Sequence, residues 1–190
     1  IIHSQNWLLK MYKYISKYNI GLVGASGSMQ SICPNINLKQ FLYQKKFFKI
    51  KNFFKYVFLL FLYPFLFYFY GKFPNPHIRT NAFMISRNDF LKIDFGRFLF
   101  KFQTWYFESG RNSLTKQVEK NGKKVVIVGD DFKSYEKNQW EISNTFWNND
   151  QGNLLISDNQ SRKYQYANKE LRSLFKNSAW GGGVDNFLIK

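Results

Sequence analysis

Hydrogen-bonding side chains are concentrated in the segment 75–81, Asn-Pro-His-Ile-Arg-Thr-Asn, which directly precedes the apolar run 82–85. Imidazole, guanidinium and amide groups in one loop can together bind hydroxyl and phosphate groups. Loops that border the sheet are where α/β folds bind ligands. His77, Arg79 and Asn81 are therefore candidate substrate-binding residues. The alternative is a polar loop whose Asn and Thr side chains satisfy their own backbone.

Glu108 is the carboxylate best placed to act as a general base. It lies between Phe107 and the Ser-Gly turn at 109–110, and a helix is expected to begin shortly after it. A helix N-terminus favours an anion, and a positioned carboxylate can take a proton from a reacting hydroxyl. Arg111, in the same segment, is a further candidate substrate-binding residue. The alternative is a helix-start acid that pairs with Arg111.

Two other polar segments adjoin apolar runs. Asp130 and Asp131 follow the run 125–128, and an acid pair at a strand end is typical of a divalent metal site. The alternative is a solvated turn in which Lys133 is the counter-charge. Asp158 and Asn159 follow Leu-Leu-Ile at 154–156, and they are candidate substrate-binding residues if that run is a strand.

The composition argues against several other kinds of site. His3 and His77 are the only histidines, and neither lies in a cluster of cysteines or acids with zinc-ligand spacing. The single cysteine, Cys33, cannot form an internal disulfide, which favours a reducing compartment. No acid precedes Asp89, so the first 88 residues supply neither a catalytic carboxylate nor paired acids for a metal ion.

The elements that must position these residues follow from hydrophobic spacing. An amphipathic helix is expected over 7–18, where lysines fall mostly between apolar residues at helical spacing: Leu8, Met11, Tyr12 and Ile15. Strands are expected at 21–25, 82–85 and 125–128. Further helices are expected from Asn88 or Asp89, from Asn112 or Ser113 to Gly122, and over 166–175. Helices that alternate with apolar strands predict an α/β fold.

The segment 38–72 has a different character. It contains seven lysines, fifteen aromatic residues and no acid, with an uncharged run at 56–71 that Pro64 interrupts. The run is shorter than the ~20 residues needed to cross a bilayer, so we expect the segment to lie in the interface of an anionic membrane. The alternative is a hydrophobic helical hairpin packed on the fold.

The formal charge of +16 is uneven, since residues 1–88 carry twelve Lys or Arg and no acid. An AT-rich genome alone also produces such a bias. Nucleic acid is disfavoured as a partner, because the aromatic residues are grouped with leucine and are not interleaved with arginine on a stacking surface.

Four strings in this order are similar to one family: GASGSMQS at 24–31, FPNPHIRTNAFMISR at 73–87, FESGRNSLTKQV at 107–118 and SDNQSRKYQYANKELR at 157–172. Together they resemble a bacterial group of GT-A-type, family-2-like glycosyltransferases of surface polysaccharide assembly. The resemblance implies a Rossmann-like α/β domain that binds a nucleotide-sugar and Mg²⁺ or Mn²⁺ through its first half and an acceptor through its second. It also implies that Glu108 is the catalytic base, although the sequence here is Glu-Ser-Gly where the family more often has Glu-Asp.

On this basis we expect a partial GT-A core at 1–37, a membrane-interface insertion at 38–72 and an acceptor-side part at 73–190. The chain begins at Ile1 and is expected to be a fragment without the donor half and its metal ligands. The expected activity is sugar transfer from a nucleotide-sugar to a glycan or lipid-linked acceptor, at the cytoplasmic face of the inner membrane. A non-enzymatic membrane-associated scaffold is the alternative function.

Overall fold

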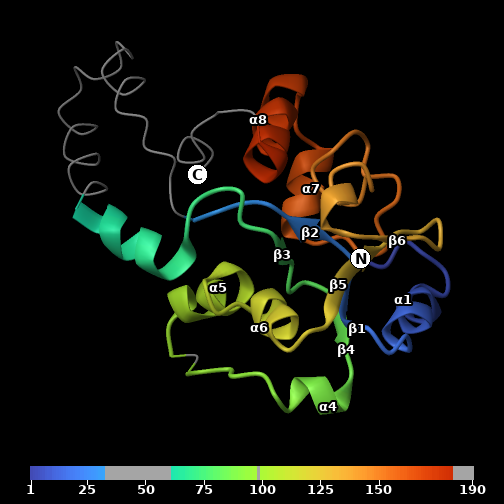
Figure 1. Ribbon diagram of the computed structural model, residues 1–190. Helices are drawn as coiled ribbons and strands as arrows, with labels where there is room; N and C mark the ends of the chain where they lie inside the picture. The colour runs from blue at the N-terminus through green and yellow to red at the C-terminus, as the bar shows by residue number, and fades with distance from the viewer. Residues whose placement is uncertain (33–60, 98, 182–190) are drawn as a thin grey trace, which may run out of the picture.

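The computed structural model describes residues 1–32, 61–97 and 99–181. Among these residues the central sheet contains, in spatial order, β4 (Phe83–Ile85), β1 (Ile20–Gly24), β5 (Lys124–Val128) and β6 (Ser134–Tyr135) (Figure 1). β1 and β5 are parallel, and the other two pairings are antiparallel. β2 (Gly27–Ser28) and β3 (His77–Ile78) form a separate antiparallel pair. The fold is therefore mixed α/β, as the alternation of helices and strands predicts.

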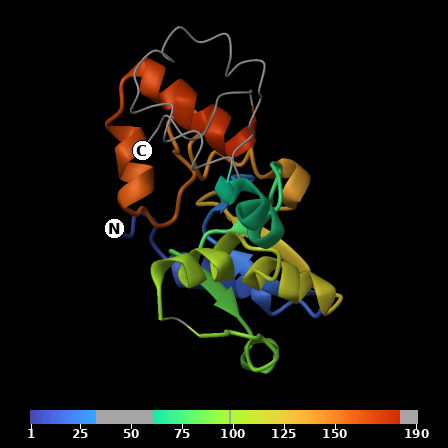
Figure 2. The same ribbon diagram turned by 90° about the vertical axis from the view of Figure 1, so that its left-hand side faces the viewer.

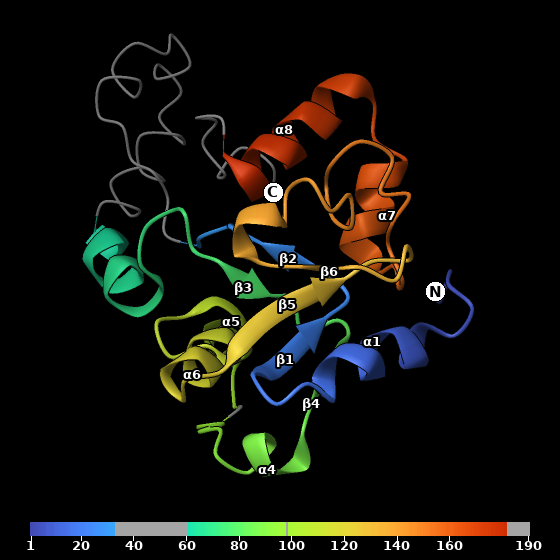
Figure 3. The ribbon, with the colours of Figure 1, turned by 45° about the vertical axis from the view of Figure 1, so that its right-hand side comes forward.

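Helices cover both faces of β1 and β5. Successive strand residues point to opposite faces, so each strand contributes to two cores. α1 (Trp7–Ile15) packs Met11 and Tyr14 against Val23, Val126 and Val128. On the other face, α6 (Leu114–Lys120) packs against Leu22, Val125 and Ile127, and α5 (Lys101–Ser109) lies beside α6 (Figure 3).

The buried face of α1 agrees with the predicted one at Met11 and Ile15 and differs from it elsewhere. Leu8 and Tyr12 are exposed, whereas Lys10 and Tyr14 are buried. Lys10 tolerates burial because its ammonium group donates to the Ser4 hydroxyl (2.8 Å), to the Asp130 carbonyl (2.7 Å) and to the Asp130 carboxylate. A tertiary ion pair therefore overrides the apolar stripe of the sequence.

The helix predicted from Ser113 to Gly122 is confirmed as α6. Ser113 is its N-cap residue and Asn121 its C-cap residue. Gly122 follows with a positive φ of 76°, a conformation that glycine adopts without steric cost. The chain then enters β5 at Lys124, which supports the predicted strand at 125–128.

Two other helix predictions are wrong in their boundaries. α4 (Arg87–Phe90) begins before Asn88, because the Ser86 hydroxyl accepts from the Asp89 amide as N-cap. The helix predicted at 166–175 corresponds to α8 (Lys169–Trp180), which begins and ends later than predicted, whereas α7 (Asn159–Gln165) is not predicted. The side chain of Asn168 caps α8 by accepting from the Leu171 amide, so the chain breaks just before it.

A third hydrophobic cluster holds α7 and α8 at the end of the molecule remote from α4 (Figure 2). It lies under a loop that follows the 3-10 helix η2 (Lys137–Gln139), and its buried members are Phe146, Trp147, Tyr164, Phe175 and Ala179. The apolar run 154–156, considered above as a possible strand, does not form one. It is reduced to an isolated bridge between Ile2 and Ile156.

Of the segment predicted to lie in a membrane interface, residues 38–60 are outside the described part of the chain. Residues 61–70 are helical and contact α5, since the Tyr70 hydroxyl donates to the Phe102 carbonyl (2.9 Å). Within 1–32, 61–97 and 99–181, no helix combines the length and the apolar character that crossing a bilayer requires.

Candidate functional site

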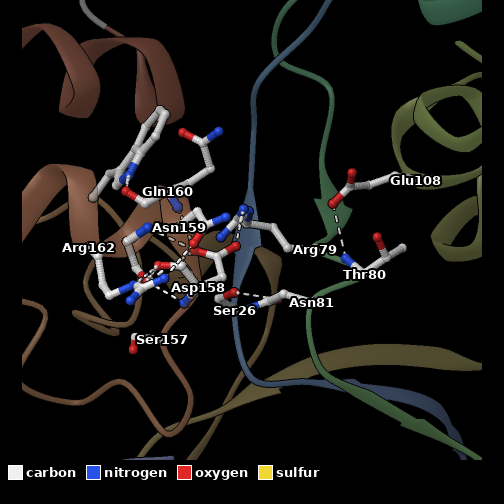
Figure 4. Close-up of polar contacts among 12 residues, drawn as sticks. Ser26, Arg79, Thr80, Asn81, Glu108, Ser157, Asp158, Asn159, Gln160 and Arg162 are labelled. Carbon is white, nitrogen blue, oxygen red and sulfur yellow. Dashed lines mark hydrogen bonds and ion pairs between the residues drawn. The ribbon is translucent and has the colours of Figure 1, made fainter. Parts of the chain in front are cut away.

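The loop that follows β3 is the centre of the candidate site (Figure 4). The Arg79 amide donates to the carbonyl of Ser26 (3.1 Å), and the Ser26 hydroxyl donates to Asn81 Oδ1 (3.3 Å). Residues 77–81 therefore lie against the segment that leaves the carboxyl end of β1. In α/β folds this end of the strands is where ligands are bound.

Glycines allow this close approach. A Cβ atom at Gly24 would lie 2.5 Å from a methyl carbon of Ile78, and one at Gly27 would lie 2.7 Å from the Trp140 ring. Neither distance is tolerated by packed carbon atoms. The glycines in the string at 24–31 are thus required so that β3 and Trp140 can pack on the chain that leaves β1.

Arg79 and Asp158, both predicted site residues, form an ion pair across 79 positions of sequence. Arg79 Nη2 lies 2.6 Å from Asp158 Oδ2, and the two side chains are 12% and 22% exposed. The guanidinium carbon also lies 4.0 Å from the centroid of the Phe146 ring. Arg79 Nη1 is buried without a hydrogen-bond partner in the described part of the chain, and the cation–π contact partly compensates for this.

Asp158 is also the N-cap residue of α7. Its Oδ1 accepts from the amides of Gln160 (3.0 Å) and Ser161 (2.8 Å), and from the Ser161 hydroxyl (3.1 Å). Burial raises the pKa of Asp158, but Arg79 and the Ser161 hydrogen bonds outweigh it and hold that pKa below its usual range. The carboxylate therefore stays ionised, with hydrogen bonds or ion pairs to both oxygens.

Glu108 lies in the last turn of α5, a helix that the sequence does not predict, and the helix expected after it begins at Leu114 as α6. Its Oε1 accepts from the Thr80 amide (3.0 Å), the neighbour of Arg79 (Figure 4). It forms no ion pair within the described ranges, and its side chain is half-buried. The C-terminal end of a helix disfavours an anion, so the Thr80 hydrogen bond is what holds the carboxylate in this position.

His77 lies in β3 and is buried. Its Nδ1 lies 2.8 Å from the Asn75 carbonyl, which requires the proton to be on Nδ1. Burial lowers the pKa of His77, and the charges of Arg79 and Lys116 lower it further against the opposing effects of Asn75 and Glu108. The ring is therefore neutral at pH 7, and its Nε2 is a hydrogen-bond acceptor.

Arg111 does not join Glu108. Its guanidinium donates to the Phe67 carbonyl from Nε (3.3 Å) and Nη2 (3.2 Å), and its amide donates to the Phe69 carbonyl (2.7 Å). The alternative, in which Glu108 pairs with Arg111, is therefore not observed among the described contacts. Arg111 instead joins the turn after α5 to the helical residues 61–70 through these hydrogen bonds.

Asn159 follows Asp158 in the sequence, but its side chain lies on a different part of the surface. Its Oδ1 accepts from Arg162, and its side chain lines an open groove of about 830 Å³ between α7 and α8. Tyr166 and Phe175 also line this groove, whereas Glu108 and Arg79 do not. Asn159 is thus separated from the ion pair that its neighbour makes.

Phe146 was not predicted as part of the site. It belongs to the loop 143–153, in which four non-glycine residues have positive φ: Asn144, Trp147, Asn149 and Gln151. The Gln151 side chain fixes the loop by accepting from the Trp147 amide (3.1 Å) and donating to the Ser161 carbonyl (2.9 Å). No local pattern reveals this role, because Phe146 becomes relevant only when Arg79 packs on its ring.

The contacts of the acid pair at 130–131 favour the alternative, a turn in which Lys133 is the counter-charge, over a metal site. Asp130 binds Lys10, while Asp131 accepts from the Tyr135 hydroxyl (2.6 Å) and lies 3.8 Å from Lys133 Nζ. These contacts occupy the carboxylates and place an ammonium group where a metal ion would bind. Within the described residues, no group of three His, Cys, Asp or Glu side chains is arranged to hold a metal ion.

The four strings on which the sequence resemblance rests thus meet around residues 77–81, through Ser26, Glu108 and Asp158. No protein-family model matches the chain, and neither a curated protein nor a solved structure is significantly similar to it.

Proposed function

We propose that the chain is the acceptor-side part of a GT-A-type glycosyltransferase. The full-length protein would transfer a sugar from a nucleotide-sugar to a hydroxyl group of a glycan or lipid-linked acceptor in cell-surface polysaccharide synthesis. The nucleotide-sugar site and the Mg²⁺ or Mn²⁺ ligands are proposed to lie outside these 190 residues. Asp130 and Asp131 do not fit that metal site, because Lys10 and Tyr135 already bind them.

The observation that carries the proposal is the arrangement around Thr80. Its amide holds Glu108, and its neighbour Arg79 holds Asp158. One half-buried carboxylate with unused hydrogen-bonding capacity therefore lies beside residues 77–81, which carry a neutral imidazole in β3, His77, and an amide in the following loop, Asn81. A general base flanked by hydrogen-bonding groups is the set that activation of a sugar hydroxyl requires.

In the proposed reaction Glu108 is the catalytic base. The acceptor hydroxyl gives its proton to the Glu108 carboxylate while its oxygen forms the new bond to the anomeric carbon of the donor. The bond from that carbon to the nucleoside diphosphate breaks, and the diphosphate leaves with the electron pair. A single base opposite the leaving group gives inversion at the anomeric carbon.

The other side chains position this base. Arg79 is held between Asp158 and the Phe146 ring, so that the next amide, Thr80, points at Glu108. His77 Nε2 and Asn81 supply acceptor and donor groups for further hydroxyls of the substrate. Binding energy from such groups fixes the reacting hydroxyl near the base.

The test is Glu108→Gln in the full-length protein, assayed by nucleoside diphosphate release in the presence of acceptor glycans. Loss of a general base lowers turnover by about 10²–10⁴-fold. Glu119→Gln is the matched control, since Glu119 lies on α6 and pairs with Lys137, and it should retain activity. Near wild-type turnover by Glu108→Gln would disprove the assigned role.

The non-enzymatic scaffold makes a different prediction. Its function would depend on the membrane-facing segment alone, so neither full-length wild type nor Glu108→Gln would bind or turn over nucleotide-sugars. Sugar transfer that Glu108→Gln abolishes and Glu119→Gln preserves excludes the scaffold.

A further inference from the structure

Two segments that are distant in sequence but in contact with each other expose large apolar side chains. Their exposed members are between 47% and 82% accessible, and they are Phe61, Phe65 and Tyr68 in the helical residues 61–70 and Leu99, Phe100 and Phe102 at the start of α5. The first three are spaced at i, i+4 and i+7, which places them on one helical face. We call these six residues the aromatic surface.

Direct contacts join the two segments. The Tyr70 hydroxyl donates to the Phe102 carbonyl (2.9 Å). The Tyr106 ring makes edge contacts with Phe69 (5.7 Å between centroids) and Tyr70 (6.1 Å). Figures 1 and 2 both show the helical residues 61–70 beside α5. The two helices are therefore packed together, and each also carries exposed apolar side chains.

Basic residues accompany these side chains, and acids do not. Residues 61–72 and 97–107 include Lys72, Arg97 and Lys101 but no Asp or Glu. The Lys72 ammonium lies 5.3 Å from the Phe67 ring, and that of Lys101 lies 5.2 Å from the Trp105 ring. These two rings are half-buried, so the ammonium groups lie close to the exposed apolar side chains without covering them. Exposed apolar side chains with cations nearby match a bilayer interface, where aromatic side chains enter the acyl boundary and ammonium groups meet lipid phosphates.

We propose that the aromatic surface docks the protein on an anionic lipid bilayer. The sequence predicts membrane contact only for residues 38–72, whereas the structure adds a second element, Leu99–Phe102. A protein partner is disfavoured, because the charged side chains of the two segments are all cations and offer no group that would recognise the basic side chains of a protein surface. The proposal uses no residue from 33–60 and holds whether or not the protein transfers sugar.

A consequence for the acceptor rests on the proposed function. Glu108 lies six residues after Phe102 on α5, roughly 9 Å along the helix axis at 1.5 Å per residue. A bilayer that contacts the start of α5 would therefore hold a lipid-linked acceptor within a short distance of the proposed base.

The experiment is co-sedimentation of the chain with vesicles of phosphatidylcholine, alone or mixed with phosphatidylglycerol. Leu99→Ser/Phe100→Ser removes two exposed side chains and should lower partitioning onto the mixed vesicles about tenfold. Ile142→Ser is the matched control, since Ile142 is 72% exposed and lies outside both segments. Lys101→Glu should weaken binding to the mixed vesicles and leave binding to phosphatidylcholine unchanged.

Circular dichroism of each variant establishes that the fold is intact. Equal partitioning of wild type and Leu99→Ser/Phe100→Ser would overturn the proposal. So would concentration-dependent self-association that the double variant abolishes while vesicle binding is absent, because a second copy would then be the occupant. Glu108→Gln should bind vesicles like wild type, so failure of docking and failure of catalysis are separable.

Discussion

Asp158 and Glu108 are two carboxylates that hold adjacent residues of one loop, and their surroundings are opposite. Asp158 begins α7, pairs with the Arg79 side chain and accepts three hydrogen bonds at Oδ1. Glu108 ends α5 and accepts one hydrogen bond, from the Thr80 amide, among the described residues. The first carboxylate is satisfied at both oxygens, and the second has an oxygen available.

This difference favours a structural role for Asp158 and a catalytic role for Glu108. A buried carboxylate whose lone pairs are all used stabilises the fold and has little capacity to accept a proton from a substrate. A carboxylate that is held at one oxygen keeps the other for a reacting group. The sequence assigns substrate binding to Asp158, whereas its contacts favour a positioning role, and Glu108 remains the proposed catalytic residue.

The largest expected effect on stability comes from Asp158→Ala. The substitution leaves Arg79 buried without a counter-charge and removes the cap of α7, so the free energy of unfolding should fall by about 3–5 kcal/mol. Urea denaturation measures this loss. Glu136→Ala is the control, because its ion pair with Lys124 is exposed and should contribute at most about 1 kcal/mol.

Arg79→Met should cost less than Asp158→Ala. Asp158 keeps its hydrogen bonds to Gln160 and Ser161 when the guanidinium is removed, so the expected loss is about 1.5–3 kcal/mol. The same urea titration gives the value. If Arg79→Met lost as much stability as Asp158→Ala, the hydrogen bonds to Gln160 and Ser161 would not be compensating Asp158 for the missing guanidinium.

The next effect is a pH dependence that comes from His77. Its pKa is lowered in the folded state, so the unfolded chain binds the proton first as the pH falls below about 6.5. Stability should therefore decrease on acidification, by at most about 1.4 kcal/mol per pH unit. Melting temperatures at several pH values measure this slope. In His77→Asn the slope between pH 7 and the onset of carboxylate protonation should be reduced.

The smallest expected stability effect is that of Glu108→Gln. An amide oxygen can accept the Thr80 hydrogen bond in place of the carboxylate, so the free energy of unfolding should change by no more than about 0.5 kcal/mol. A large loss of stability would mean that Glu108, like Asp158, is a structural carboxylate. The comparison between the two regions would then fail.

Local sequence was sufficient to predict those helices and strands whose patterns lie within a few residues. β1 and β5 follow from short apolar runs, and α6 follows from Ser113 at its start and Gly122 at its end. It was insufficient for Glu108, because residues 101–109 have no clear apolar stripe that predicts α5. It also failed at Asn168, whose side-chain cap divides α7 from α8.

The sequence by itself determined the mixed α/β class, the identity of the polar segments and the one-sided distribution of charge. Only the tertiary structure decided which of those segments meet. Lys10 is buried because Asp130 lies 120 positions away in sequence but next to it in space, and Arg79 selects Asp158 and Phe146 in the same way. Hydrophobic periodicity acts over a few residues, whereas ion pairs and ring contacts form only after the sheet and its helices have packed. The separate roles of Asp158 and Glu108 are therefore visible only in the fold.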